Sequence, residues 1–177
     1  MGRLTHRTAA GFTYFVTTRT WENRGLFRVL ENAEILVECL MRYREKGAYL
    51  LHEFVVMPNH LHLLLTPSDE TSLERAMQFI KGGSSHEIHK QRGHKMQIWQ
   101  AGFHESTIRD HQDFASRQQY IRVNPLEARL VSRPEDWAYG SASGRFTLDL
   151  QPMRLSSGAK ARFNTETGIV GAKAPTP

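Results

Sequence analysis

The alternation of apolar and polar residues predicts three strands in the first half of the chain. Residues 12–18 are aromatic and β-branched, a composition typical of a strand. Residues 48–56 and 60–66 form two further apolar runs, and the Pro58-Asn59 pair between them predicts a turn. Because this gap is short, we expect the second and third strands to form a hairpin.

Apolar residues three and four positions apart predict a helix on either side of this hairpin. The first helix ends near Gly47, a residue typical of a helix C-cap. Its apolar face consists of Val29, Ala33, Leu36, Leu40 and Tyr43. Thr71 or Ser72 caps the second helix, which carries an apolar face of Leu73, Met77 and Ile80. Each glycine of the Gly82-Gly83 pair costs roughly 1 kcal/mol inside a helix, so we expect a kink or break there.

The remaining pattern predicts an extended segment followed by helices. Residues 97–108 are interpreted as extended, and Asp110 as the N-cap of a helix that runs to about Val123. Pro125 pushes the preceding residue out of the helical region, so this helix is expected to stop there. Residues 125–131 then form a separate short helix that begins with the proline.

The order β-α-β-β-α-β followed by helices predicts an α+β fold. We expect a ferredoxin-like, RRM-like sandwich, with an antiparallel sheet that carries helices on one face and a C-terminal helical extension. With 177 residues, the chain has the length of a single domain. We place this domain at residues 1–144, and predict a basic, flexible tail at 145–177 that includes Lys160, Arg162 and Lys173.

Composition narrows the class of partner and the compartment. The chain has 23 Lys and Arg against 18 Asp and Glu, a net charge of +5, which favours a polyanionic partner such as nucleic acid. The single cysteine, Cys39, excludes an internal disulfide and a cysteine-based zinc site, and we expect it to be buried. No apolar run of 18 residues predicts a membrane span, and the start does not have the pattern of a secretory signal. The expected compartment is therefore the cytoplasm.

The segment His60-Leu61-His62 is the strongest candidate for chemistry. Alternate side chains of a strand share a face, with Cα atoms roughly 6.6–6.8 Å apart, so both imidazoles lie on one side and could share a metal ion. Two strand histidines without a function are the alternative, and Glu53 on the neighbouring strand is the nearest expected carboxylate. Tyr120 and Asn124 share a helix face at i and i+4, although packing and helix capping also explain this pair.

Three blocks of sequence resemble one family. They are VVMPNHLHLLLTP, IWQAGFHESTIRD and QQYIRVNPLEARLVSRPEDWAYGSA. Together they are similar to the REP-associated tyrosine transposases, which belong to the single-tyrosine HUH transposase superfamily. The resemblance covers about residues 10–143.

The resemblance implies a metal-dependent endonuclease and strand transferase that cleaves single-stranded DNA near hairpin-forming repeats. It assigns the nucleophile to Tyr120, which would form a covalent 5′-phosphotyrosine, and a Mg²⁺ or Mn²⁺ site to His60, His62 and Asn124. The helical extension would then carry the tyrosine. The chain would be nucleoid-associated, as a monomer or a homodimer. The alternatives are a non-catalytic hairpin-binding protein of domesticated transposase origin, a nuclease that uses water, and an RNA-recognition module.

Other residues could contact DNA without taking part in chemistry. Candidates for phosphate contacts, each equally consistent with a solvated surface, are Lys81, Lys90, Arg92, Lys95 and Arg109. Residues that could stack on bases or pack in the core are Trp21, Trp99 and Phe103. Surface or phosphate contacts are favoured over metal binding for His86, His89, His94 and His104.

Overall fold

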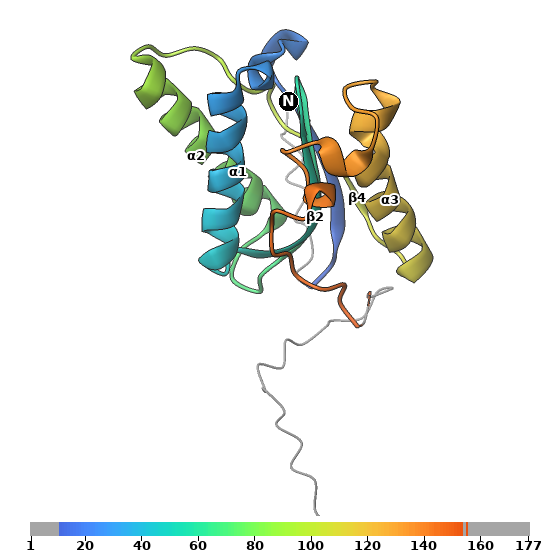
Figure 1. Ribbon diagram of the computed structural model, residues 1–177. Helices are drawn as coiled ribbons and strands as arrows, with labels where there is room; N and C mark the ends of the chain where they lie inside the picture. Colours follow the sequence, from blue (N-terminus) through green and yellow to red (C-terminus); the bar gives the residue numbers. More distant parts are fainter. Residues whose placement is uncertain (1–10, 154, 156–177) are drawn as a thin grey trace, which may run out of the picture.

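The chain folds around a four-stranded antiparallel sheet. The computed structural model describes residues 11–153 and 155. The strands lie in the order β2-β3-β1-β4 (Figure 1). They are β1 (Tyr14–Arg19), β2 (Tyr49–Met57), β3 (His60–Pro67) and β4 (His104–Thr107). The predicted hairpin is confirmed, because β2 and β3 are antiparallel neighbours joined by two residues.

Helices cover both faces of this sheet. The three α-helices are α1 (Leu30–Glu45), α2 (Leu73–Arg92) and α3 (His111–Glu127). Four short 3₁₀ helices are η1 (Trp21–Asn23), η2 (Leu26–Arg28), η3 (Pro134–Asp136) and η4 (Ser141–Ser143). Figure 1 shows α1 and α2 on one side of the sheet and α3 on the other. The α+β class and the order β-α-β-β-α-β are confirmed, and the predicted helical extension is α3.

The alternation of side chains along β3 divides the interior into two cores. Leu61, Leu63 and Leu65 belong to the larger core with α1 and α2. Leu64 points the other way and joins a smaller core with Phe114 and Ile121 of α3. His62 must therefore share the α3 face of the sheet with Leu64. Both faces of β3 are thus covered, and every residue of the strand except His60 is buried.

The predicted break at Gly82 and Gly83 is wrong, because α2 is one continuous helix. The reason lies in its packing against α1. A Cβ atom added at Gly83 would lie 2.8 Å from the sulfur of Cys39 and 3.1 Å from the ring of Tyr43. The glycine allows the two helices to approach closely, and this packing outweighs its low helix propensity. Cys39 is buried, as predicted.

The predicted helix end before Pro125 is also wrong. Asp110 caps α3 as expected, because its side chain accepts a hydrogen bond of 2.8 Å from the Asp113 backbone N–H. The helix then continues through Pro125 to Glu127. Pro125 is buried, so its packing helps to offset the one backbone hydrogen bond that a proline near the helix end removes. Asn124 therefore lies inside the helix and is not a cap.

Residues beyond 144 contact the domain before the description ends. Phe146 and Leu148 pack against the larger core. Asp149 accepts hydrogen bonds of 2.7 and 2.8 Å from Arg44 and one of 2.8 Å from the Leu51 backbone. The domain boundary at 144 stays a prediction, and the basic residues of the predicted tail, Lys160, Arg162 and Lys173, lie outside the described residues.

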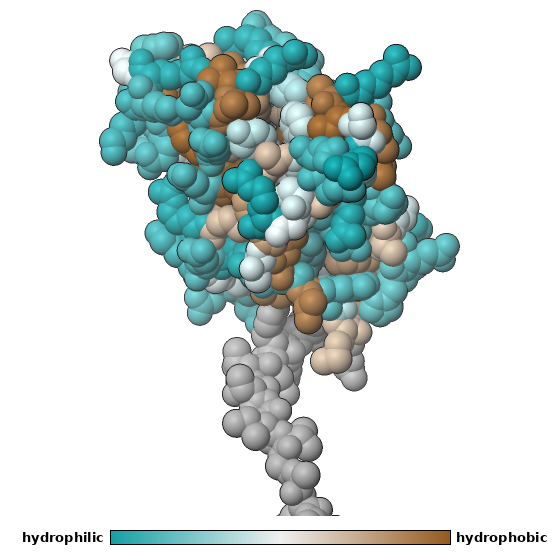
Figure 2. All heavy atoms as spheres, viewed as in Figure 1, coloured by the Kyte–Doolittle hydropathy of each residue, from teal (hydrophilic) through white to brown (hydrophobic). Residues whose placement is uncertain are grey.

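The face of the molecule drawn in Figure 2 is mainly polar. In the view of Figure 2, hydrophilic side chains cover most of the molecule, and apolar atoms appear as separate patches between them. Among the described residues, no helix combines the length and the apolar character needed to cross a membrane.

Candidate active site

The two histidines of β3 lie side by side on the face covered by α3. Their ring centroids are 4.7 Å apart, with the planes at 79°. His60 is the first residue of β3 and follows the two-residue turn from β2, while His62 is buried further along the strand. The strand period therefore brings both rings to one place, as predicted.

A hydrogen bond fixes the protonated nitrogen of the His60 ring, and one to a hydroxyl is compatible with the same tautomer of His62. The Nδ1 atom of His60 lies 2.7 Å from Oδ1 of Asn59, which can only accept, so Nδ1–H donates. The Nδ1 atom of His62 lies 2.8 Å from the hydroxyl oxygen of Thr17, directly opposite on β1. When each Nδ1 carries the proton, each Nε2 keeps a lone pair. Metal-binding histidines typically have this arrangement.

Burial keeps both imidazoles neutral at pH 7. Desolvation and, less strongly, the charge of Arg19 lower the pKa of His60 to about 4, although a hydrogen bond with the Asn124 side chain opposes the shift. Desolvation, followed by the charges of His60 and Arg19, lowers the pKa of His62 to about 3. Neutral imidazole is the form that binds metal ions, so the local environment favours that form.

Helix α3 brings the predicted tyrosine and asparagine to the same histidines. The ring of Tyr120 lies 5.3 Å from the ring of His62, and its side chain is 41% exposed. Asn124, one turn later, is buried and hydrogen-bonded to His60. The structure thus brings together the four residues singled out from the sequence: an exposed phenol lies beside two neutral imidazoles and an amide, which are side chains of types that can bind a metal ion.

Strand β1 supplies three further side chains that the sequence analysis did not identify. Phe15 stacks on His62 with ring centroids 5.5 Å apart, and Thr17 holds that ring. Arg19 lies opposite His60 and is exposed. Their alternate spacing indicates that these three residues share one face of the strand. Only the register of β1 against β3 shows that this face lies next to the histidines. Arg117 of α3 lies beside Phe15, with its guanidinium 4.9 Å from the centre of the Phe15 ring.

Glu53, the carboxylate expected near the histidines, is engaged elsewhere. It is completely buried on β2, accepts a hydrogen bond of 3.0 Å from Nε of Arg122, and also accepts one from the hydroxyl of Ser141. Within residues 11–153 and 155, no three His, Cys, Asp or Glu side chains are grouped so as to hold a metal ion. The available ligands are therefore the two imidazoles and the Asn124 amide. Arg122 also ties α3 to β2 on the side away from Tyr120.

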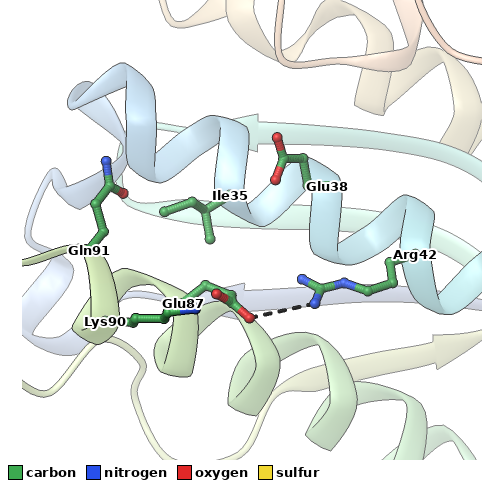
Figure 3. A pocket seen from close by; sticks show the side chains of 6 residues that line it. All are labelled: Ile35, Glu38, Arg42, Glu87, Lys90 and Gln91. Carbon is green, nitrogen blue, oxygen red and sulfur yellow. Dashed lines mark ion pairs between the residues drawn. The ribbon is translucent and has the colours of Figure 1, made fainter.

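The predicted phosphate-binding residues are not gathered at this site. Lys81, Lys90 and Arg92 lie on α2, across the sheet from α3. Lys81 donates to the backbone carbonyls of Gln100 and Gly102, and burial lowers its pKa. Lys90 lines a groove between α1 and α2, in which Arg42 and Glu87 form an ion pair of 3.6 Å (Figure 3).

The remaining candidates have local roles in the structure. Lys95 is exposed after α2, and Arg109 forms an ion pair of 3.4 Å with Asp113. Trp99 packs in the larger core and Phe103 packs against it, which favours packing over base stacking for both. The His89 ring contacts the backbone of Met96, with Nε2 2.6 Å from its carbonyl oxygen.

Comparisons with known proteins identify the family of the chain. The family model of the IS200-like transposases matches residues 12–124, which include both histidines, the tyrosine and the asparagine. A REP-associated tyrosine transposase of Escherichia coli K12 is 26% identical over 145 residues, covering 78% of this chain and 84% of that protein. A relative from Haemophilus influenzae is 29% identical over 107 residues, and the match covers 55% of this chain and 61% of the relative's sequence.

A solved structure shares the fold. It is a REP-associated tyrosine transposase bound to a REP hairpin, with a TM-score of 0.67 and 20% identity, and the match covers 93% of this chain and all of that chain. The resemblance drawn from the sequence blocks is thereby confirmed. Because the family model covers well over half of the sequence, the chain belongs to the IS200-like transposases.

Proposed function

We propose that this transposase nicks and rejoins single-stranded DNA through Tyr120 in a metal-dependent reaction. The observation that carries the proposal is the position of the Tyr120 ring, 5.3 Å from His62 and half-exposed beside the His60–His62 pair. A nucleophile next to metal ligands is the arrangement that phosphoryl transfer needs. A buried tyrosine lacks this access; Tyr49, for example, is enclosed in the larger core and donates to the Leu40 carbonyl.

The side chains present fit a divalent cation. His60 and His62 offer unprotonated Nε2 atoms, and Asn124 offers an amide oxygen. We assign Mg²⁺ or Mn²⁺, because both accept carbonyl and phosphate oxygens and leave coordination positions open. When bound, the cation supplies positive charge that offsets the negative charge developing on the phosphoryl group. Arg19, exposed beside His60, adds a second positive group for the phosphodiester.

The step at Tyr120 is a transesterification. The phenol proton leaves to solvent, and the Tyr120 oxygen attacks the phosphorus of a phosphodiester. The bond from phosphorus to the 3′ oxygen breaks, and that oxygen takes up a proton. The products are a 5′-phosphotyrosine and a free 3′-hydroxyl. Attack by another 3′-hydroxyl reverses the step and joins a new strand, with no net hydrolysis and no need for ATP.

We further propose that the substrate contains a DNA hairpin and that one chain forms a complete site. The hairpin is supported by the E. coli relative, named for its association with REP sequences, and by the solved relative bound to a REP hairpin. The single chain already places Tyr120 against its own histidines. Mixing Tyr120→Phe chains with chains carrying His60→Ala and His62→Ala should therefore restore no cleavage. Restored cleavage would show that the site is shared between chains.

The test of the reaction uses a labelled DNA hairpin with single-stranded flanks and Mn²⁺, followed by denaturing gels. The wild-type chain should give a covalent protein–DNA species and a free 3′-hydroxyl end, and Tyr120→Phe should give neither. Equal products from both chains would refute the mechanism. Free 5′-phosphate ends without an adduct would indicate hydrolysis by water, and binding without any cleavage would indicate a hairpin-binding protein.

A further inference from the structure

A pocket of about 260 Å³ lies directly beside the candidate active site and shares His60 with it. Three segments distant in sequence form its wall: the stretch through η1 and η2, the turn between β2 and β3, and the end of α3. The lining residues that matter most are Asn23, Arg28, Pro58, Asn59, Ala128 and Leu130. Because His60 belongs to both, a molecule that occupies the active site has a neighbouring part within reach of the pocket.

The chemistry of the wall fits a flat group with an apolar face and a polar edge. Pro58, Ala128 and Leu130 provide apolar surface, and Leu130 is 36% exposed. Asn23 and Asn59 place amides on the rim, where they can donate and accept hydrogen bonds. The volume lies just below the roughly 300–1,000 Å³ of ordinary small-molecule sites, which suits one nucleotide and excludes a duplex.

Backbone hydrogen bonds hold the floor of the pocket in place. The Phe27 N–H donates to the Pro58 carbonyl over 3.0 Å. The Thr20 N–H and hydroxyl both donate to the Asn59 carbonyl, over 2.9 and 3.0 Å. These contacts join the turn that positions His60 to the segment that carries Asn23. The pocket is thus formed before any ligand arrives, which reduces the entropy lost on binding.

Unfavourable backbone conformations are concentrated around this pocket. Among the described residues, the non-glycine residues with positive φ are Glu22 at 54°, Asn23 at 54° and Arg129 at 56°. Asn23 lines the pocket, Glu22 precedes it, and Arg129 lies between the lining residues Ala128 and Leu130. A left-handed conformation costs such residues roughly 1–2 kcal/mol, and conformations of this kind cluster at functional sites.

The left-handed conformation of Arg129 forms a tight turn at the end of α3. Arg129 occupies the left-handed position of a Schellman motif, in which the Leu130 N–H donates to the Pro125 carbonyl and the Arg129 N–H to the Leu126 carbonyl. Glycine is the usual residue at this position. The tight turn places Leu130 in the pocket wall, directly after the helix that carries Tyr120.

We propose that this pocket binds one unpaired nucleobase of the DNA strand, next to the phosphodiester held at His60 and His62. The proposal rests on the function proposed above and adds a base-specificity site to it. The occupant follows from continuity with the active site, since a strand crossing His60 presents its adjacent base at the pocket. Arg28 is exposed on the rim and has no ion-pair partner among the described residues, so it is available for the next phosphate.

The experiment measures base preference separately from DNA binding. All chains carry Tyr120→Phe, so the DNA stays intact, and the probe is a DNA hairpin with randomised single-stranded flanks of eight nucleotides on both sides. Retained molecules are sequenced in the presence of Mg²⁺. Asn23→Gly removes an amide where glycine suits the backbone, and Leu130→Trp fills the pocket. The matched control, Gln91→Ala, removes an amide from the groove between α1 and α2.

The chain with Tyr120→Phe alone should enrich one base at one flank position at least fivefold. Asn23→Gly and Leu130→Trp should lose this preference while total retention changes less than about twofold, and Gln91→Ala should keep it. Preference that persists in both pocket variants would overturn the proposal, as would retention with no enriched flank position. No retention of any hairpin would instead refute the proposed function. Thermal unfolding of each variant identifies chains that have not folded.

Discussion

At the scale of single residues, the hydroxyl of Thr17 sets the availability of the His62 lone pair. Its oxygen lies 2.8 Å from Nδ1 of that ring, and no other hydrogen-bond partner of Nδ1 is found among the described residues. Thr17→Val keeps the shape of the side chain but removes this partner, and losses of such partners typically reduce metal affinity by about 10–100-fold. We expect a Mn²⁺ titration followed by water-proton relaxation to show a decrease of at least tenfold. Unchanged affinity would contradict the assignment of His62.

The neighbouring Thr18 provides a matched control with an opposite expectation. It points to the other face of β1, and its buried hydroxyl has no hydrogen-bond partner among the described residues. Replacing an unsatisfied buried hydroxyl with a methyl group removes a desolvation cost of about 1–3 kcal/mol. Thr18→Val should therefore raise the free energy of unfolding in urea while leaving Mn²⁺ affinity unchanged. A loss of stability would show that the hydroxyl is satisfied.

His52 makes stability depend on pH. Its ring is buried, with Nε2 2.8 Å from the Thr66 hydroxyl, and desolvation lowers its pKa in the folded state. The unfolded chain therefore binds a proton below about pH 6.5 that the folded chain resists, so stability falls as the pH drops. His52→Gln should reduce the difference in unfolding free energy between pH 7.5 and 5. An equal difference in both chains would refute this, because His60 and His62 contribute alike to each.

The residue-level site was predictable in part. The His60–His62 pair follows from strand alternation, and Tyr120 and Asn124 from helical spacing together with the family resemblance. Thr17, Phe15 and Arg19 could not be placed, because the sequence does not specify which residue of β1 lies opposite which residue of β3. Glu53 lies on the neighbouring strand, as expected, but its partner Arg122, 69 residues away on α3, could not be foreseen.

At the scale of elements, the two glycines of α2 differ in their surroundings and allow a direct comparison. A Cβ at Gly82 would meet nothing within 4 Å, whereas one at Gly83 would meet Cys39 and Tyr43. Gly82→Ala should therefore stabilise the chain by roughly 0.5–1 kcal/mol through helix propensity. Gly83→Ala should destabilise it by overpacking. Urea unfolding of both variants checks the pair, and equal effects would contradict the close approach of α1 and α2.

The ion pair of Arg122 with Glu53 sets the orientation of α3 on the sheet. Tyr120 and Asn124 lie on one side of the helix, and Arg122, two residues from each, lies on the other and reaches β2. Arg122→Met leaves a buried carboxylate without its cation, which should cost about 2–4 kcal/mol. Adding Glu53→Gln should recover part of that loss in urea unfolding. No recovery in the double variant would show that the two side chains do not act as a pair.

The errors at element level share one cause. Gly82-Gly83 and Pro125 both have low helix propensity, and local propensity alone predicted a break at each. The structure continues through both because tertiary packing supplies more energy than the propensity removes: α1 fits against Gly83, and Pro125 is buried. The capping signals at Asp110 and Ser72 were read correctly, since a cap depends on its own next three residues.

At the scale of the whole molecule, the sheet separates two functions. The α1 and α2 face is a packed core that stabilises the fold, and the α3 face holds the buried histidines and the exposed tyrosine. The order of elements and the class of fold follow from periodicity, because each strand and helix has its own clear pattern. The position of α3 across the histidines cannot be predicted from periodicity, because it depends on the smaller core formed by Leu64, Phe114 and Ile121.

The most direct measurement is the identity of the residue that carries DNA after cleavage. The wild-type chain is incubated with a DNA hairpin bearing single-stranded flanks and Mn²⁺, digested with protease, and analysed by mass spectrometry. The account predicts one modified peptide, with a 5′-phosphate of the oligonucleotide attached to Tyr120. DNA attached to a different residue, or cleaved DNA with free 5′-phosphates and an unmodified Tyr120 peptide, would contradict it.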